Sequence, residues 1–286
     1  MDAAATLPRQ VSCQDAPGEE NVVAMSVRPA AVAGLFYPDE ARELKAMIAS
    51  CLTQGVAQTT ARVPKALIVP HAGYVYSGPV AASAYARLAA LRESVRRVVL
   101  LGPAHRVGFR GIAASSADAF ETPLGRIEID REALSQALTL PGVRVFDRAH
   151  TDEHSLEVQL PFLQTVLREF RLVPLLVGDA SPEEVAAVIE ALWNGNETLL
   201  LISSDLSHYL SYEEARRIDR ETTGAIERLD PQGISYDQAC GRLPVQGLLL
   251  AAQRRGLRVT TLDLRNSGDT AGPRDSVVGY GAYALA

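Results

Sequence analysis

Three short apolar runs of this sequence each lead into a polar segment that contains a histidine. They are 66–70 with His71, 98–101 with His105, and 199–202 with His208. Runs of four or five aliphatic residues that end in Gly, Pro or Ser are typical of buried strands in a mainly parallel sheet. Ligands of such sheets bind at the carboxyl ends of the strands. We therefore expect the three imidazoles to lie along one edge of a single sheet, where they can form a metal or proton-transfer site.

A metal site needs a further ligand, and the sequence offers two classes of candidate. Asp205 and His208 are three residues apart, a spacing that places both on one side of a helix that starts there. Cys240 precedes a helix predicted from about Val245, and this helix N-terminus together with Arg242 would lower the pKa of the thiol. The alternative for Cys240 is a small buried apolar residue, and the sequence leaves that choice open.

The elements that must position these residues alternate along the chain. Besides the three runs above, strands are expected at 143–146, 171–177, 258–263 and 277–285, and helices at 39–51, 80–91, 131–139, 155–168, 182–194, 212–229 and 245–255. Residues 71–79 are expected to form a glycine-rich turn. This alternation favours an α/β fold, a three-layer α/β/α sandwich around a mostly parallel, mixed sheet, which the last strand should close.

Length and composition favour one domain. The chain has 286 residues, of which 47% are hydrophobic, so it can bury a sizeable core. Residues 1–26 show no apolar period and are expected to be a flexible N-terminal extension, which leaves residues 27–286 as a single α/β domain. No run of apolar residues is long enough to span a membrane, and the N-terminus lacks the pattern of a secretory signal.

Other classes of function find little support in the sequence. The net charge of −6 and the lack of a basic stripe argue against nucleic-acid binding. The glycine spacing matches no nucleotide-binding loop, so we expect no nucleotide cofactor. Three scattered cysteines fit a reducing compartment, and we expect a cytoplasmic protein.

Five motifs, in matching order, resemble the MEMO family (mediator of ErbB2-driven cell motility), which has many archaeal and bacterial members. They are VPHAGYVYSG at 69–78, GPAH at 102–105, DEHSLE at 152–157, SDLSHY at 204–209 and CGR at 240–242. The resemblance covers about residues 28–286. It implies the α/β/α fold that this family shares with class III extradiol dioxygenases, which cleave catechol rings with non-haem iron.

The resemblance also implies a site. Its metal ligands would be His71, His105 and Cys240, with Asp205 and His208 beside them. The implied metal is iron, with copper as the alternative and zinc less favoured. The implied pathway partners are an AMMECR-type protein and a radical S-adenosylmethionine enzyme. Because a thiolate replaces the carboxylate of the usual two-histidine iron site, ring cleavage does not follow from the fold.

Further residues have both a functional and a structural interpretation. His208 is the candidate general acid/base, and Asp205 would orient His208 or His105, or bind the metal if Cys240 does not. Tyr74 would line the pocket with its hydroxyl toward the metal, or serve packing. His154 and Glu157 would support the ligands from behind, or belong to a helix-capping segment near the site. The remaining expectations are solvent exposure for His150 and backbone freedom near the site at Gly73, Gly78 and Gly102.

The leading hypothesis is a metal-dependent redox enzyme that acts on a small, preferably aromatic, molecule. Two alternatives stay open. One is a protein without catalytic activity that binds a peptide or partner in the same cleft. The other is a zinc-dependent hydrolase, since two histidines and a thiolate can hold a zinc ion that activates water.

Overall fold

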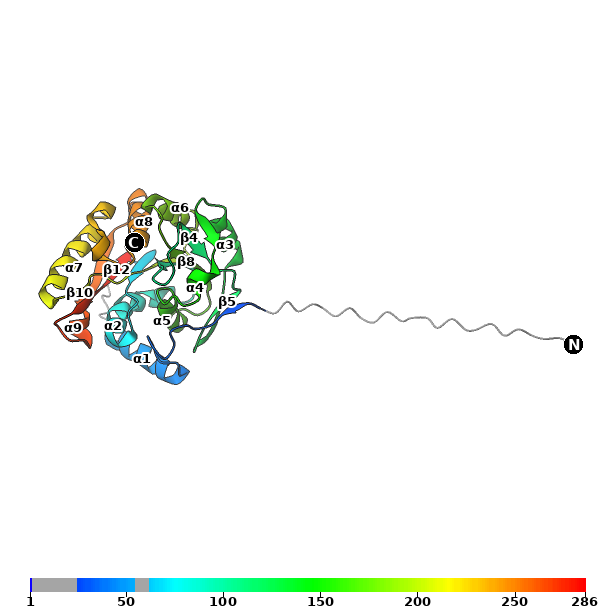
Figure 1. Ribbon diagram of the computed structural model, residues 1–286, viewed down its shortest axis with the longest axis horizontal. Coiled ribbons are helices and arrows are strands. Elements are labelled where there is room, and N and C mark those ends of the chain that lie inside the picture. Colours follow the sequence, from blue (N-terminus) through cyan, green and yellow to red (C-terminus); the bar gives the residue numbers. More distant parts are fainter. Residues whose placement is uncertain (2–24, 55–61) are drawn as a thin grey trace.

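A computed structural model of the chain describes residues 25–54 and 62–286, together with Met1. The expected flexible extension, 1–26, lies almost entirely outside the described residues. The rest of the chain forms a large mixed sheet with helices on both faces (Figure 1). The expected α/β/α sandwich around a mixed sheet is therefore confirmed.

The large sheet has the strand order β10-β12-β2-β9-β3-β8-β4-β7, and β11 also pairs with β12. Its strands are β2 (Ala66–Val69), β3 (Arg97–Pro103), β4 (Ile112–Ala114), β7 (Val143–Val145), β8 (Arg171–Val177), β9 (Thr198–Ser203), β10 (His208–Leu210), β11 (Val259–Asn266) and β12 (Val277–Leu285). Four neighbours, β2, β9, β3 and β8, run parallel, and antiparallel strands flank them on both sides. All residues of β2 and β9 are buried, as expected for central strands covered on both faces.

The parallel register brings the ends of three strands together. Val69 of β2 pairs with Ser203 of β9, and Leu101 of β3 pairs with Ile202 of the same strand. His71 follows the first of these strands and His105 follows β3, so both begin from one edge of the sheet. The convergence expected from the sequence thus holds for these strand ends.

Helices cover the two faces of the sheet. They are α1 (Ala41–Gln54), α2 (Tyr74–Tyr85), α3 (Arg131–Leu138), α4 (Asp147–His150), α5 (Leu160–Val166), α6 (Pro182–Ala191), α7 (Tyr212–Glu227), α8 (Arg242–Arg254) and α9 (Ser267–Thr270). Figure 1 shows α1, α2 and α5 on one side of the sheet and α6, α7 and α8 on the other. In α7 the buried residues Ala215, Thr222 and Ile226 recur at helical spacing, which explains how this otherwise polar helix packs on the sheet.

A small sheet attaches Val27 and Arg28 to the body of the protein. It has the order β1-β5-β6, where β1 is Val27–Arg28, β5 is Ala119–Thr122 and β6 is Gly125–Glu128. The two residues of β1 pair in parallel with Ala119 and Phe120 of β5. This pairing fixes the position of Arg28, whose side chain donates to the carbonyl oxygens of His150 and Glu153.

Two sequence-based expectations about the fold were wrong. Residues 71–79 do not form a turn throughout, because α2 already begins at Tyr74 and contains Gly78. That glycine serves helix packing: a Cβ atom there would lie 3.0 Å from Sγ of Cys51 in α1. The last strand does not close the sheet at an edge, since β12 lies inside it and pairs with β2, β10 and β11.

Among the described residues, no helix is both long and apolar enough to span a bilayer.

Candidate metal centre

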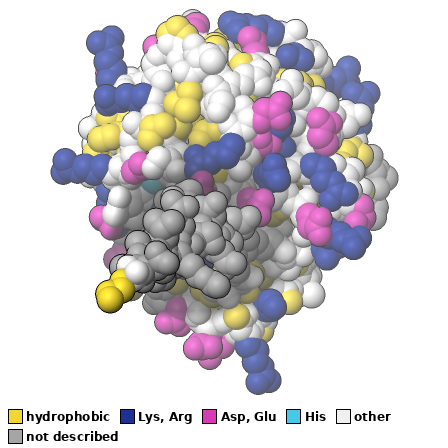
Figure 2. Space-filling model, turned by 90° about the vertical axis from the view of Figure 1, so that its right-hand side faces the viewer, with side chains coloured by type: hydrophobic (Ala, Val, Ile, Leu, Met, Phe, Trp, Pro, Cys, Tyr) yellow, Lys and Arg dark blue, Asp and Glu magenta, His cyan; other side chains and the backbone are white. Residues whose placement is uncertain are grey.

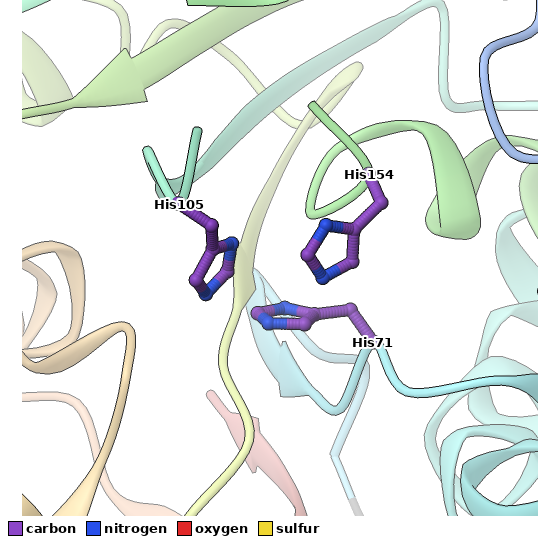
Figure 3. A group of neighbouring side chains, drawn as sticks. All are labelled: His71, His105 and His154. Atoms are coloured by element: carbon purple, nitrogen blue, oxygen red, sulfur yellow. The ribbon is translucent and has the colours of Figure 1, made fainter. Parts of the chain in front are cut away.

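Three histidine rings converge at the carboxyl edge of the sheet. His71, His105 and His154 each offer one possible ligand atom, and these atoms lie within 4.8 Å of one another. Figure 3 shows the three rings directed toward a common point. His71 follows β2, His105 follows β3, and His154 comes from the irregular segment between α4 and α5. The third histidine of the cluster is therefore His154, not His208 as the strand-end pattern suggested.

His71 is buried, and its ring is oriented by a hydroxyl. Nδ1 of His71 lies 2.7 Å from Oγ of Ser203, and that hydroxyl donates its proton to the carbonyl oxygen of Ser155 (2.6 Å). The shared contact therefore requires a proton on Nδ1, which leaves the lone pair on Nε2. Burial, and after it the neighbouring histidines, hold the pKa of His71 well below its usual value. Its ring is thus neutral, the form that binds metals.

His105 is oriented by a carboxylate, that of Glu153. Oε1 of Glu153 lies 3.0 Å from Nδ1 of His105, and Oε2 accepts the backbone N–H of the same histidine at 2.5 Å. Burial opposes ionisation of Glu153, but its hydrogen bonds with His105 and with the N–H of Ser155 outweigh burial and lower its pKa to about 2. The carboxylate thus holds a proton on Nδ1 of His105 and leaves Nε2 free, an arrangement common behind metal-binding histidines.

Glu153 is the functional residue that sequence reasoning missed. It stood inside the motif at 152–157, but nothing in the sequence paired it with His105, which is 48 positions away. An acidic residue next to a histidine in a loop is a weak signal by itself. It becomes informative only when a second histidine is known to lie in reach.

His154 lies inside the cluster, whereas the sequence suggested a supporting or capping role. Its Nδ1 atom is buried and has no hydrogen-bond partner among the described residues, although Oε1 of Glu153 is 3.3 Å away. Burial is the main cause that lowers the pKa of His154 to about 4, so this ring is also neutral. The ring of Phe36 packs against it at 4.6 Å between centroids. Nδ1 of His154 therefore lies beside the carboxylate that also orients the ring of His105.

Cys240 joins the cluster from a distant part of the chain. Its Sγ atom lies 3.3 Å from Nε2 of His71. The approach depends on Gly241, where a Cβ atom would lie 2.6 Å from Cβ of Ser204 and 2.7 Å from the carbonyl oxygen of Ser203. Only glycine fits this closely against the end of β9. The sulfur atom is thus brought next to the nitrogen that the hydroxyl of Ser203 leaves unprotonated.

The expected lowering of the thiol pKa is wrong for the protein without a metal. Burial raises the pKa of Cys240 well above its usual value, and the carboxylate of Asp205 raises it further. Arg242 lies over the ring of Tyr236 instead, 5.8 Å from its centroid. Desolvation therefore dominates over the helix N-terminus, and a metal ion would have to displace the thiol proton.

Asp205 ties two of the strand ends together. Its Oδ1 atom accepts the backbone N–H of His71 at 2.7 Å, and its own N–H donates to Sγ of Cys240 at 3.3 Å. Burial raises the pKa of Asp205 to about 6, against the opposing effects of the N–H of His71 and of the nearby histidines. The carboxylate was expected to orient the ring of His208 or His105; its hydrogen bond goes to the backbone of His71 instead.

The cluster opens on one side into a cleft of about 960 Å³. His105 and Cys240 lie on its wall together with His208, which is the first residue of β10. Apolar residues form much of the remaining wall, among them Pro103, Ala104, Val177, Ala239 and Leu243. His208 is thus placed beside the candidate ligands and in contact with the space that a small molecule could occupy.

Three other expected residues have structural roles. Tyr74 is buried, and its hydroxyl donates to the carbonyl oxygen of Val158 at 2.7 Å, so packing describes it better than a hydroxyl directed at a metal. Glu157 is fully buried in an ion pair with Arg28. His150, expected to be exposed, is 2% exposed, with Nε2 3.1 Å from the carbonyl oxygen of Ala113. Its burial follows from the packing of the short helix α4 against β4.

The comparisons with known proteins agree with the motifs. A family model described as Memo-like protein matches residues 28–284. The chain belongs to this family. A MEMO1 family protein from Aquifex aeolicus is 39% identical over 267 residues, covering 90% of this chain and 98% of the relative. One from Methanosarcina acetivorans is 37% identical over 275 residues, covering 91% and 100%. A crystal structure of an uncharacterized protein from Escherichia coli K12 aligns with a TM-score of 0.48 at 16% identity, over 77% of this chain and 99% of that chain.

The residues of this Memo-like protein fit a transition-metal ion. Two imidazoles have their protons fixed on Nδ1, a third, neutral imidazole lies within 4.8 Å of them, and a sulfur atom lies beside the first. Neutral imidazole and thiolate are ligands that iron, copper and zinc accept, whereas magnesium and calcium prefer oxygen. The site is therefore a candidate centre for a first-row transition metal. The donor set does not by itself select one of the three metals.

Proposed function

We propose that this Memo-like protein binds a redox-active transition metal, iron or copper, and uses it to oxidise a small molecule. One observation carries the proposal: three imidazoles and a thiol meet beside an open cleft, whose wall includes His105 and Cys240. A cleft that only recognises a ligand has no need for such a set of donors. The apolar wall of the cleft supports an aromatic substrate, because aromatic rings bury well against aliphatic side chains.

Each residue has a role in this proposal. His71, His105 and Cys240 hold the ion, with His154 next to them as a further donor. A bound iron or copper ion supplies the capacity to change oxidation state. His208 transfers a proton to or from the molecule in the cleft, because its side chain lies on the wall beside Cys240. The proposed setting is the cytoplasm, in a pathway shared with an AMMECR-type protein and a radical S-adenosylmethionine enzyme.

The test is metal analysis of protein purified without oxygen. Wild type should contain nearly one equivalent of iron or copper, and His71→Ala and Cys240→Ser should each lose most of it. His208→Ala is the matched control, since it removes an imidazole from the same cleft and should keep the metal. Wild-type protein that binds neither metal after reconstitution contradicts the proposal. Metal retained in Cys240→Ser removes the thiol from the ligand set.

A recognition cleft is the second candidate, because the rim of the cleft exposes an aromatic ring. Tyr236 is 81% exposed, and the guanidinium of Arg242 lies over its ring. Such a pair suits a peptide with an aromatic or acidic side chain. Absence of bound metal and of turnover would favour this function. Tight zinc binding without sensitivity to oxygen would favour the zinc hydrolase.

A further inference from the structure

The segment that carries Glu153 and His154 has little regular structure of its own. Between the end of α4 at His150 and the 3₁₀ helix that starts at Glu157, the chain forms only turns and irregular residues. Glu153 fixes part of this segment from within, because Oε1 accepts the backbone N–H groups of His154 and Ser155, both at 2.9 Å. The carbonyl groups of His150 and Glu153 also have a side-chain partner from outside the segment.

That side chain is Arg28 of β1, close to the start of the domain in sequence. Its guanidinium is buried, and Nε donates to the carbonyl oxygen of His150 at 3.0 Å. Nη2 donates to the carbonyl oxygen of Glu153 at 2.7 Å, and Nη1 pairs with the carboxylate of Glu157. One side chain thus binds the segment at its start, its middle and its end. It does so across more than 120 positions of sequence.

Glu157 extends this connection to residues 28–37, which we name the N-terminal strap. Its carboxylate accepts the backbone N–H groups of Ala31 (2.8 Å) and Val32 (3.0 Å) and the hydroxyl of Tyr37 (2.6 Å). Glu157 is fully buried, so these donors and Arg28 replace the water that it loses. The strap also brings Phe36 against the ring of His154.

From this geometry we infer that Arg28 is a positioning residue of the metal centre. It holds the carbonyl groups of His150 and Glu153, and so fixes the segment that carries two groups of the site. Glu153 in turn orients the ring of His105, and His154 belongs to the cluster itself. The N-terminal strap is therefore part of the machinery that shapes the centre, although none of its residues offers a ligand atom.

The choice of arginine follows from the positions of the three acceptors. They lie around one planar group, and a guanidinium presents several N–H donors in fixed directions. Lysine would keep the charge opposite Glu157 but cannot reach all three acceptors from one ammonium. Arg28→Lys should therefore fold and keep the ion pair, while it loses part of the hold on the segment.

The inference rests on the proposed metal function, so its test needs one measurement that does not depend on metal binding. The first measurement is amide hydrogen exchange in the metal-free protein. Arg28→Lys and Arg28→Met should exchange the amides of His105, His154 and Ser155 faster than wild type, because these N–H groups all bind the carboxylate of Glu153. The second is titration with Co²⁺ under exclusion of oxygen, read by its visible absorption.

Loss of a partner behind a metal-binding histidine typically weakens metal affinity by about 10- to 100-fold. We expect this range for Arg28→Met, together with a changed Co²⁺ spectrum, and a smaller effect for Arg28→Lys. The matched control is Arg97→Met, which removes a partly buried arginine that pairs with Asp130 at 2.6 Å. Arg97 lies at the start of β3, whereas His105 follows the opposite end of that strand. The loss of Arg97 should therefore leave the Co²⁺ spectrum unchanged.

The outcomes separate the two ideas. Unchanged exchange at the three amides and an unchanged Co²⁺ spectrum in Arg28→Met would overturn the inference. Failure of the wild type to bind Co²⁺ contradicts the proposed function, while the exchange measurement still tests the role of Arg28. If Arg28→Met does not fold, both measurements are repeated on the double variant Arg28→Met/Glu157→Gln. This variant no longer contains the buried carboxylate that the loss of Arg28 leaves unpaired. Changes of equal size in Arg97→Met would also overturn the inference.

Discussion

Glu153 contacts His105 twice, through the backbone N–H with Oε2 and through Nδ1 with Oε1. The first contact fixes the main chain of the histidine, and the second fixes the rotation and the protonation of its ring. A carboxylate that binds both groups leaves the imidazole one free nitrogen, Nε2, and one orientation. His105 is therefore prepared for a ligand before any ligand arrives.

Replacement of Glu153 by glutamine should weaken metal binding by about 10- to 100-fold. The amide of Glu153→Gln keeps one acceptor but turns an N–H group toward a donor of His105, so the ring loses its fixed protonation. Competition with a chromophoric chelator measures the affinity. Glu43→Gln, at an exposed position in the first turn of α1, is the control and should bind like wild type. Equal affinities in the two variants would show that Glu153 does not support the site.

Gly102 of β3 should not tolerate alanine. A Cβ atom there would lie 2.9 Å from Cδ2 of Leu156 and 3.0 Å from Oγ of Ser155, so the segment behind the cluster would have to move. We expect Gly102→Ala to lower the free energy of unfolding by about 1–3 kcal/mol. Urea denaturation measures the change.

Gly108→Ala provides the matched control for this experiment. Among the described residues, no atom outside its two chain neighbours lies within 4 Å of a Cβ atom at Gly108, so the added methyl group meets open space. The free energy of unfolding should stay within about 0.5 kcal/mol of wild type. A free energy of unfolding of Gly102→Ala that also stays within about 0.5 kcal/mol of wild type would mean that the close approach at Gly102 is relieved without cost.

Tyr74→Phe should affect stability and leave metal content unchanged. The hydroxyl of Tyr74 donates to the carbonyl oxygen of Val158, and its loss leaves a buried acceptor without that partner. The expected cost is about 1–2 kcal/mol in the free energy of unfolding. Metal analysis and thermal denaturation together check this result. Loss of metal or of turnover at unchanged stability would restore a direct role for Tyr74 in the site.

Asp219 predicts a pH dependence of stability. Burial raises its pKa to about 6, against hydrogen bonds from Ser207 that lower it. Because the folded pKa lies above the unfolded value, the contribution of Asp219 to the free energy of unfolding should fall as the pH rises from about 4 to 6, by at most about 3 kcal/mol. Asp219→Asn lacks this contribution, so the free energy of unfolding of wild type minus that of Asp219→Asn should decrease over this range.

Urea denaturation at several pH values measures this profile. Asp275→Asn, at an exposed position, is the control and should keep the wild-type pH dependence. A difference between wild type and Asp219→Asn that stays constant or grows between these pH values would contradict the role of Asp219.

Local patterns in the sequence were enough to predict most elements of the fold. The strands expected at 171–177 and 277–285 have these bounds in the structure, because long aliphatic runs bounded by polar residues leave little choice. The convergence of His71 and His105 also followed, since parallel neighbours end at one edge. The start of α2 was missed because Gly78 looked like a turn residue, whereas it allows two helices to touch.

The rest of the site depends on contacts between distant residues. No spacing rule pairs Glu153 with His105, Arg28 with Glu157, or His154 with His71. The pKa of Cys240 was misjudged for a related reason: the neighbours along the chain suggested a charge effect, but the desolvation comes from residues that fold over it. Burial of an individual side chain, as with His150, is a property of the assembled fold.

The contact between Cys240 and His71 joins residues that are 169 positions apart. The donor atoms of the cluster are therefore close together only in the folded protein. In the unfolded chain, an ion can bind them only singly. An ion that binds there acts as a ligand of the native state alone, and at 100 times its dissociation constant it adds about 2.7 kcal/mol to the free energy of unfolding. Supply of the metal and survival of the folded protein are thus thermodynamically linked.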